Sequence, residues 1–145
     1  MRELKFRGKR LDNKGFFYGS YLYLNTRDYD WTGKEVGNKK EVHFIKDEEG
    51  YNLPVNPKTV GQYTGLKDCN DVEIYEGDIL EYRFHNPLTK EKESIKYEVI
   101  YEYGEFRVIV DDGRNKSRKP LYMETNSIVI GNIYQNPELL EGVKQ

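Results

Sequence analysis

The sequence TVGQYTGLKDCNDVEIYEGDIL, residues 59–80, places strand-forming runs and turn-forming residues in close succession. Val60–Thr64 has strand character, and Gly65 is expected to end that strand. Asn70-Asp71 predicts a hairpin tip, because both residues accept unusual backbone angles. Gly77-Asp78 predicts a second tight bend into the next strand. A Gly-Asp pair that enters a strand is typical of the start of a small SH3-type barrel.

The composition is that of a small folded protein with a modest core. The 145 residues suffice for one domain or two small subdomains. Mean hydropathy is low at −0.89, but 14% of the residues are aromatic, whereas disordered segments are poor in aromatics. Because 13 of them are Tyr, we expect tyrosine rings to supply much of the packing.

Charge and cysteine content argue against several classes of protein. A formal net charge of −2 does not fit a chain that coats nucleic acid over its whole surface. The single Cys cannot form an internal disulfide, which suits a reducing compartment. The N-terminus lacks the apolar core of a signal peptide, and no stretch is apolar enough to cross a membrane. We therefore expect a cytoplasmic protein without membrane contact.

The N-terminal part begins with a predicted hairpin. Leu4–Arg7 alternates apolar and basic residues, which indicates a half-buried strand. A turn at residues 12–15 separates this strand from a second one at Phe16–Leu24. The two strands are expected to pair.

The segment after this hairpin is more polar. Residues 25–40 predict a loop, and Trp31 is expected to pin that loop to the body of the protein. A short strand follows at residues 41–46. Two prolines in residues 51–58 remove backbone donors, so this segment cannot form a central strand.

The clearest secondary-structure signal is a hairpin in the C-terminal part. Apolar residues alternate through both of its strands: Tyr97, Val99, Tyr101 and Tyr103 in the first, and Phe106, Val108 and Val110 in the second. Gly104-Glu105, with Gly first, predicts a type II′ turn. That turn would set the register of three pairs on one face: Tyr103 with Phe106, Tyr101 with Val108, and Val99 with Val110.

The remaining segments complete a mainly β fold. Residues 111–120 predict a polar loop, and Ser127–Tyr134 predicts a last strand with a bend or bulge at Gly131. Asn136-Pro137-Glu138 predicts the start of a short helix that ends before Gly142. We predict an irregular N-terminal β subdomain over residues 1–71, followed over residues 72–145 by an SH3-like β-barrel with a short C-terminal helix.

Three motifs of the chain resemble those of the YopX family of phage and prophage proteins. The first two are RELKFR at residues 2–7 and TVGQYTGLKD with EIYEGDI between residues 59 and 79. The third is IGNIYQNPELL at residues 130–140. The chain departs from the family pattern at Asn70-Asp71, where the family usually has Asn-Gly.

The resemblance implies a mainly β fold with a barrel-like C-terminal part, an oligomeric state and no activity that can be named. It also singles out a set of motif residues that we expect to be structural: Gly61, Tyr63, Gly65, Asp68, Tyr75, Gly77 and Asp78.

The central stretch carries carboxylates that could suggest a hard-cation site: Asp68, Asp71, Glu73, Glu76 and Asp78. Their spacing does not fit a calcium loop, because Glu73 stands where Gly is required and no closing Glu follows. Turn formation and solvation explain these acids better. A metal-dependent hydrolase built on them remains a third hypothesis.

Other reactive residue types lack the partners that chemistry needs. GQYTGLK at residues 61–67 does not have the spacing of a phosphate-binding loop. Cys69 lies among acids, which disfavours the thiolate form. His43 and His85 have no partners at metal-ligand spacing. We therefore predict no catalytic residue, no metal ligand and no cofactor.

One basic cluster offers a candidate nucleic-acid site: Arg114, Lys116, Arg118 and Lys119. With tyrosines nearby, such a cluster could hold phosphates while aromatic rings stack on bases. The competing interpretation is a solvated loop, which the acidic remainder of the chain favours.

The first functional hypothesis is a non-enzymatic phage accessory protein in the cytoplasm of the bacterial host. It would act through contacts with itself, as a homo-oligomer, and with an unidentified host or phage protein. Low hydropathy and abundant tyrosine motivate this hypothesis. Nucleic-acid binding through the basic cluster is the alternative.

Overall fold

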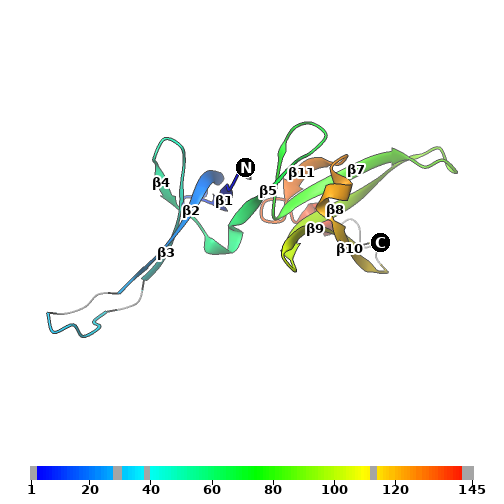
Figure 1. Ribbon diagram of the computed structural model, residues 1–145. Helices are drawn as coiled ribbons and strands as arrows, with labels where there is room; N and C mark the ends of the chain where they lie inside the picture. Colours follow the sequence, from blue (N-terminus) through cyan, green and yellow to red (C-terminus); the bar gives the residue numbers. More distant parts are fainter. Residues whose placement is uncertain (1–2, 28–30, 38–39, 112–113, 142–145) are drawn as a thin grey trace. The chain divides into compact units, whose positions relative to one another are not determined.

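Antiparallel β-strands make up most of the chain in the computed structural model, which describes residues 3–27, 31–37, 40–111 and 114–141 (Figure 1). The prediction of a mainly β fold is confirmed. The chain divides into two compact units: Leu4–Gln62, and Tyr63–Gln145 together with the first three residues. In the sequence the boundary falls between Gln62 and Tyr63. The sequence predicts a boundary after residue 71.

The unit Leu4–Gln62 is built on one antiparallel sheet of strand order β4-β3-β2-β1-β5. Its elements are β1 (Phe6–Lys9), β2 (Phe16–Thr26), β3 (Lys40–Lys46), β4 (Asn52–Pro54), the 3-10 turn η1 (Pro57–Thr59) and the beginning of β5 (Gly61–Lys67). β1 and β2 form the predicted hairpin, with Phe6 opposite Gly19. β4 lies at the sheet edge, where the missing N–H of Pro54 is tolerated.

Buried side chains, one close backbone contact and one side-chain hydrogen bond stabilise this sheet. Ile45 and Val55 are buried. A Cβ on Gly19 would lie 1.9 Å from the carbonyl oxygen of Lys46, so only glycine fits there. Thr59 connects β1 to η1, because its Oγ1 accepts a 2.8 Å hydrogen bond from the Lys9 N–H.

β2 and β3 continue beyond their neighbours as a two-stranded ribbon, here called the arm (Leu22–Thr26 paired with Lys40–His43). β1 pairs with β2 only as far as Gly19, and β4 pairs with β3 only from Phe44 onward. Apart from a hydrogen bond from the Val55 N–H to the His43 carbonyl, no described strand is recorded as pairing with the arm. Two apolar cross-strand pairs share one face: Leu24 with Val42 within the arm, and Leu22 with Phe44 at its base, where Phe44 also pairs with Pro54 of β4.

The prediction that Trp31 pins its loop to the body is wrong. Trp31 is 95% exposed, because it lies past the paired part of the arm, where the described chain offers no apolar surface to receive it. Residues 28–30 and 38–39 of the predicted loop lie outside the described residues.

The unit that follows Gln62 is built on a five-stranded antiparallel sheet of order β10-β9-β8-β7-β11. Its elements are the end of β5, β6 (Glu73–Tyr75), β7 (Asp78–His85), β8 (Lys92–Glu102), β9 (Glu105–Asp111), β10 (Lys116–Pro120), the 3-10 turn η2 (Leu121–Glu124), β11 (Ile128–Asn132) and the helix α1 (Glu138–Glu141). Its core consists of Ile74, Leu80, Tyr97, Val99, Val108 and Leu121. The SH3-like barrel is not confirmed, because among the described residues the edge strands β10 and β11 do not pair to close the sheet.

The β8–β9 hairpin keeps the predicted faces but not the predicted register. Tyr101 lies opposite Phe106 and Val99 lies opposite Val108. The turn is Tyr103-Gly104, and both residues have positive φ, of 51° and 79°, which is the requirement of a type I′ turn. Since the shift is two residues, every side chain stays on its predicted face.

Two further local predictions are wrong. Residues 116–120 were expected in a loop, but they form β10, because the edge of β9 offers a full set of ladder partners. Gly65 was expected to end its strand. It lies instead within β5, where a register irregularity between Tyr63 and Lys67 accommodates its φ of 83°.

Other local predictions are confirmed. β11 contains a register shift between Val129 and Gly131, as expected of a bulge. A short helix follows Asn136-Pro137, although its predicted end at Gly142 lies outside the described residues. Among the described residues, none of the helices is long and apolar enough to span a membrane.

Candidate functional site

Asp68 organises the hairpin turn at the centre of the family motif. Its carboxylate is buried and accepts three backbone hydrogen bonds. Oδ1 accepts from the N–H groups of Asn70 and Val72, at 2.8 and 2.9 Å, and Oδ2 accepts from the N–H of Val129, at 2.8 Å. The third bond joins the turn to β11. The Asp68 carboxylate therefore satisfies backbone N–H groups both of the turn and of β11.

The side chains of Asp78 and Thr64 also form hydrogen bonds with backbone groups, in the neighbouring strands β5, β6 and β7. Asp78 is 1% exposed, and its Oδ2 accepts a 2.8 Å hydrogen bond from the Tyr75 N–H. The Thr64 hydroxyl donates to the Ile74 carbonyl at 2.8 Å and accepts from the Leu66 N–H at 3.2 Å. These bonds satisfy the backbone across the irregularity around Gly65.

The remaining motif residues occupy positions that backbone geometry constrains. Gly61 pairs with Arg7 across β5 and β1. Tyr63 lies opposite Tyr75, with ring centroids 5.5 Å apart. Gly77 has a φ of 89°, and a Cβ there would lie 3.0 Å from the ring of Tyr134. The geometry thus gives each of these residues a place in the fold.

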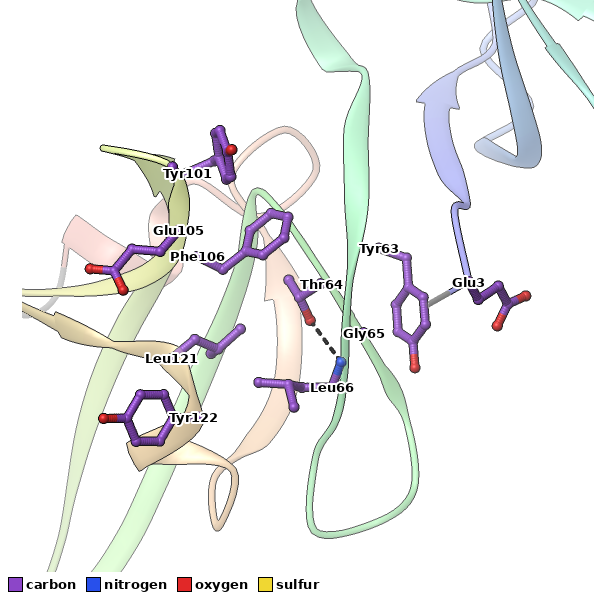
Figure 2. Close-up of a pocket in the computed structure, with 11 residues that line it drawn as sticks. Glu3, Tyr63, Thr64, Gly65, Leu66, Tyr101, Glu105, Phe106, Leu121 and Tyr122 are labelled. Atoms are coloured by element: carbon purple, nitrogen blue, oxygen red, sulfur yellow. Dashed lines mark hydrogen bonds between the residues drawn. The ribbon is translucent and has the colours of Figure 1, made fainter. Parts of the chain in front are cut away.

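The second unit has a cleft of about 690 Å³ beside the motif strand, here called the tyrosine cleft (Figure 2). Its lining comes from β5, the β8–β9 hairpin, η2 and the start of the chain: Glu3, Tyr63, Thr64, Gly65, Leu66, Tyr101, Gly104, Glu105, Phe106, Leu121 and Tyr122. In Figure 2, Leu66 and Leu121 extend toward each other at its floor, and Phe106 lies between Tyr101 and Thr64.

Aromatic and aliphatic side chains make up most of the lining of the tyrosine cleft. Tyr101 and Phe106 pack with ring centroids 5.0 Å apart, and Tyr101 remains 51% exposed. Glu3 and Glu105 border the cleft, but in Figure 2 their carboxylates are directed away from Phe106 and Leu66. Arg107 Nε lies 2.5 Å from Oε1 of Glu105, and this hydrogen bond raises the pKa of the Arg107 guanidinium.

A buried polar cluster lies beneath η2. Lys119 Nζ is 2.6 Å from Oε1 of Glu124 and 5.2 Å from the centre of the Tyr97 ring. Burial raises the pKa of the Tyr97 hydroxyl, and the nearby Glu124 carboxylate raises it further. A tyrosine hydroxyl is protonated at neutral pH in any case, so this shift extends its protonated form to higher pH.

The candidate nucleic-acid residues lie on and before the edge strand β10, and the strand separates them. Arg118 and Lys119 point to opposite faces, since neighbouring residues of a strand alternate. Arg118 Nε is 3.0 Å from Oε1 of Glu102, and Lys116 Nζ is 3.9 Å from Oδ2 of Asp111. Lys119 pairs with Glu124, and Arg114 is exposed. Lys116, Arg118 and Lys119 thus each lie beside a carboxylate.

The acids once considered for a cation site are dispersed. Asp68 and Asp78 are directed at backbone N–H groups, whereas Asp71 is exposed and lies 3.5 Å from Lys67 Nζ. Glu73 accepts a hydrogen bond from the Tyr75 hydroxyl at 3.1 Å. Across the described ranges, no three His, Cys, Asp or Glu side chains are grouped to hold a metal.

The two histidines and the cysteine come from different elements of the fold. His43 is in the arm and contacts the Tyr21 hydroxyl through Nδ1, with the Tyr23 ring 4.9 Å away. His85 and Cys69 are exposed. His43 thus belongs to the first unit, and His85 and Cys69 belong to the second.

Sequence reasoning missed most of the tyrosine cleft. It predicted that Tyr101 and Phe106 share a face, but nothing indicated that Leu121 and Tyr122 would join them. Those two residues lie in η2, a short 3-10 turn that has no hydrophobic period.

The structure defines a mainly β protein of two units, in which the motif acids and glycines build the turns of the sheets. This chain belongs to the YopX family, since the family model described as YopX protein matches residues 5–141. It is also similar to a crystal structure of protein EF1440 from Enterococcus faecalis. That similarity has 27% sequence identity and a TM-score of 0.49, and it covers 97% of this chain and 99% of that chain. None of the curated proteins matches the chain.

Proposed function

We propose that this chain is a non-enzymatic phage or prophage accessory protein of the bacterial cytoplasm. It acts through protein contacts and assembles as a homo-oligomer. Membership of the YopX family supports the phage origin. The observation that carries the proposal is the arm, which presents apolar side chains on a ribbon of only two strands.

The arm lacks the burial that a two-stranded ribbon needs. An isolated hairpin is marginally stable in water unless another layer covers its apolar face. On this face Leu22 is 39% exposed and Leu24 is 53% exposed, and Trp31 lies fully open beyond them. Exposed apolar patches of this kind mark contact surfaces.

A second copy of the chain is the occupant that this face fits best. Its cross-strand pairs, Leu22 with Phe44 and Leu24 with Val42, carry no charge. In a twofold, isologous interface these pairs would meet at the centre, and Lys46, which lies on the same face opposite Ser20, would lie at the rim. Tryptophan is also enriched among the residues that dominate interface energies. The exposed Trp31 can therefore contribute to an interface, although it does not pack within its own chain.

The motif acids support a non-enzymatic role. Asp68 and Asp78 hold backbone N–H groups, so their carboxylates already serve the turns. The partners of the basic cluster similarly favour a protein surface over a nucleic-acid site, because Glu102 and Glu124 compete with phosphates for Arg118 and Lys119.

Solution mass tests the assembly directly. Sedimentation equilibrium at micromolar concentrations should give a multiple of the 17.2 kDa chain mass. Leu24→Lys should lower that mass, because it places a charge in the interface. The matched control is Leu88→Lys, since Leu88 is 91% exposed in a loop of the other unit and should leave the mass unchanged. A monomeric wild-type chain would overturn the proposal.

Fluorescence adds a local reading, because Trp31 is the single Trp of the chain. Its emission should shift to the blue as the protein concentration rises through the assembly range, and Leu24→Lys should abolish the shift. Association with unchanged Trp31 emission would place the interface elsewhere and reject the arm.

A further inference from the structure

We propose that the ribbon formed by the ends of β7 and β8 binds duplex DNA, with one cationic face in the major groove. The ribbon consists of residues 82–85 paired with residues 92–95, and a turn joins the two segments (Figure 1). β11 pairs with β7 only as far as Glu81, and β9 pairs with β8 only from Tyr97 onward, so no third strand of the described chain accompanies the ribbon. The inference goes beyond the proposed function and concerns a different unit from the arm.

The register gives the ribbon two different faces. Tyr82 and Ile95 lie opposite each other and pack against the core of the unit. Because side chains alternate between the two faces of a strand, their neighbours along each strand point the other way. The outward face, here called the cationic face, consists of two exposed cross-strand pairs: Arg83 with Ser94, and His85 with Lys92. The cationic face is therefore directed away from the core and toward solvent.

The cations of this face are open to a ligand. Arg83 Nε donates to Oε1 of Glu81 at the base of the ribbon, but the Arg83 side chain is 68% exposed and its guanidinium has further N–H groups. Across the described ranges, no ion pair is recorded for Lys92 or His85. The cationic face thus differs from the basic cluster on β10, where carboxylates lie beside three of the cations.

The acids around the ribbon leave this face positive. Glu81 lies opposite Lys96, so the base of the ribbon carries one charge of each sign. Glu93 lies on the other face, opposite Phe84, and its Oε1 accepts a 3.1 Å hydrogen bond from Nδ2 of Asn86. The turn at residues 86–91 carries one Lys and one Glu. These charges balance one another, and the charges of the cationic face remain.

A hollow of about 420 Å³ lies along the cationic face. Its lining includes all four residues of that face together with Glu81, and Phe84 and Glu93 complete it. Guanidinium, ammonium, imidazole and hydroxyl groups can all donate hydrogen bonds to phosphate oxygens, and the bonds from charged donors are the strongest. The hollow is therefore where a backbone phosphate of the DNA would lie.

The composition of the face favours a polyanion over a protein or a membrane. The four residues of the cationic face include no apolar side chain. Protein interfaces bury an apolar centre, and peripheral membrane contacts combine cations with apolar side chains that enter the lipid. Contacts with phosphates need neither, because counterion release supplies the affinity.

The shape of the ribbon favours duplex DNA among polyanions. The major groove of B-DNA, about 12 Å wide and about 8.5 Å deep, admits a two-stranded β-ribbon. Four residue pairs extend the ribbon by about 13 Å, which is more than the depth of the groove. The major groove of an RNA duplex is too deep and narrow for side chains to read. We therefore expect the ribbon to prefer DNA.

Fluorescence anisotropy of a labelled DNA duplex, titrated with the full chain, tests the inference. A duplex of about 20 bp should bind with a Kd of about 1–100 μM at about 50 mM salt. The logarithm of the binding constant should fall against the logarithm of salt concentration with a slope of about −2 for each bound chain, because Arg83 and Lys92 each release about one counterion. The same sequence as single-stranded DNA or as an RNA duplex should bind at least tenfold more weakly.

Matched variants locate the site on the ribbon. The double variant Arg83→Gln with Lys92→Gln should weaken binding at least tenfold and remove about two units of the salt slope. Lys116→Gln with Arg118→Gln removes the same two charges from β10 of the same sheet and should leave the affinity within about twofold. The exchange Arg83→Lys with Lys92→Arg keeps both charges and should keep binding, which separates the loss of charge from a loss of folding.

Several outcomes would reject the ribbon as a DNA site. They are no binding at about 100 μM protein and low salt, equal losses in the two double glutamine variants, and equal affinity for poly-glutamate or for phosphatidylserine vesicles. A monomeric chain that binds the duplex would reject the homo-oligomer and leave the ribbon standing.

Discussion

Replacing Asp68 by asparagine should destabilise the second unit by about 3 kcal/mol. The amide has one acceptor oxygen, so it cannot serve both the turn and β11. If that oxygen keeps the Asn70 and Val72 N–H groups, the amide NH2 faces the N–H of Val129, to which the carboxylate now accepts at 2.8 Å. A buried donor left unpaired costs about 1–3 kcal/mol, and the two remaining bonds each lose roughly 0.5 kcal/mol or more with the charge.

Amide hydrogen exchange is the appropriate assay, because it reads the two units separately. The slowest amides of β7, β8 and β9 should exchange about a hundredfold faster in Asp68→Asn, since 1.4 kcal/mol corresponds to about a factor of ten. Amides around Ile45 belong to the unit Leu4–Gln62 and report whether the effect stays in the second unit.

Asp71→Asn is the matched control. Asp71 is in the same turn, its side chain is 85% exposed, and its φ of 65° suits asparagine at least as well as aspartate. It should change stability by no more than about 0.5 kcal/mol. If Asp68→Asn stays within that same range, the carboxylate does not hold the turn to β11, and the reasoning is refuted.

Two further substitutions test the packing and the electrostatics. Gly19→Ala should destabilise the first unit by about 3 kcal/mol, because its Cβ would overlap the Lys46 carbonyl, while Gly50→Ala, with nothing within 4 Å, should cost only about 1 kcal/mol by the same exchange assay. Burial raises the pKa of Glu98, so its contribution to stability is full at acid pH and falls as the pH rises through that raised pKa. Glu98→Gln should therefore be more stable than the wild type in thermal melts at neutral pH, and the gain should vanish below pH about 4; an equal gain at both pH values would contradict this assignment.

The sequence allowed prediction of features that depend on local rules. Alternation placed Tyr97, Val99 and Val108 in one face, and all three are in the core. The bulge at Gly131 and the short C-terminal helix also follow from local chemistry. Register depended on a finer choice, because Gly104 can be either the first or the second residue of a two-residue turn.

Features set by distant neighbours could not be predicted in the same way. β10 has the sequence KSRKP, which carries no apolar alternation, and it is a strand because β9 supplies its hydrogen-bond partners. The size and hydrophobicity of Trp31 predict a buried side chain, but burial also requires an apolar surface from another part of the fold. The tyrosine cleft likewise forms because η2 comes to lie beside β5 and the β8–β9 hairpin.

The pairing of β7 with β11 has a consequence for synthesis of the chain. Ile79 on β7 lies opposite Gly131 on β11, so one neighbour of β7 is made about fifty residues after β7 itself. At ordinary elongation rates this leaves an edge of β7 unpaired for about 3–10 seconds on the ribosome. During that interval Ile79 and Leu80, both fully buried in the finished fold, lack their cover on that side. A nascent chain that pauses before residue 128 would therefore expose an unpaired, apolar strand edge, and we expect it to depend on chaperones at this stage.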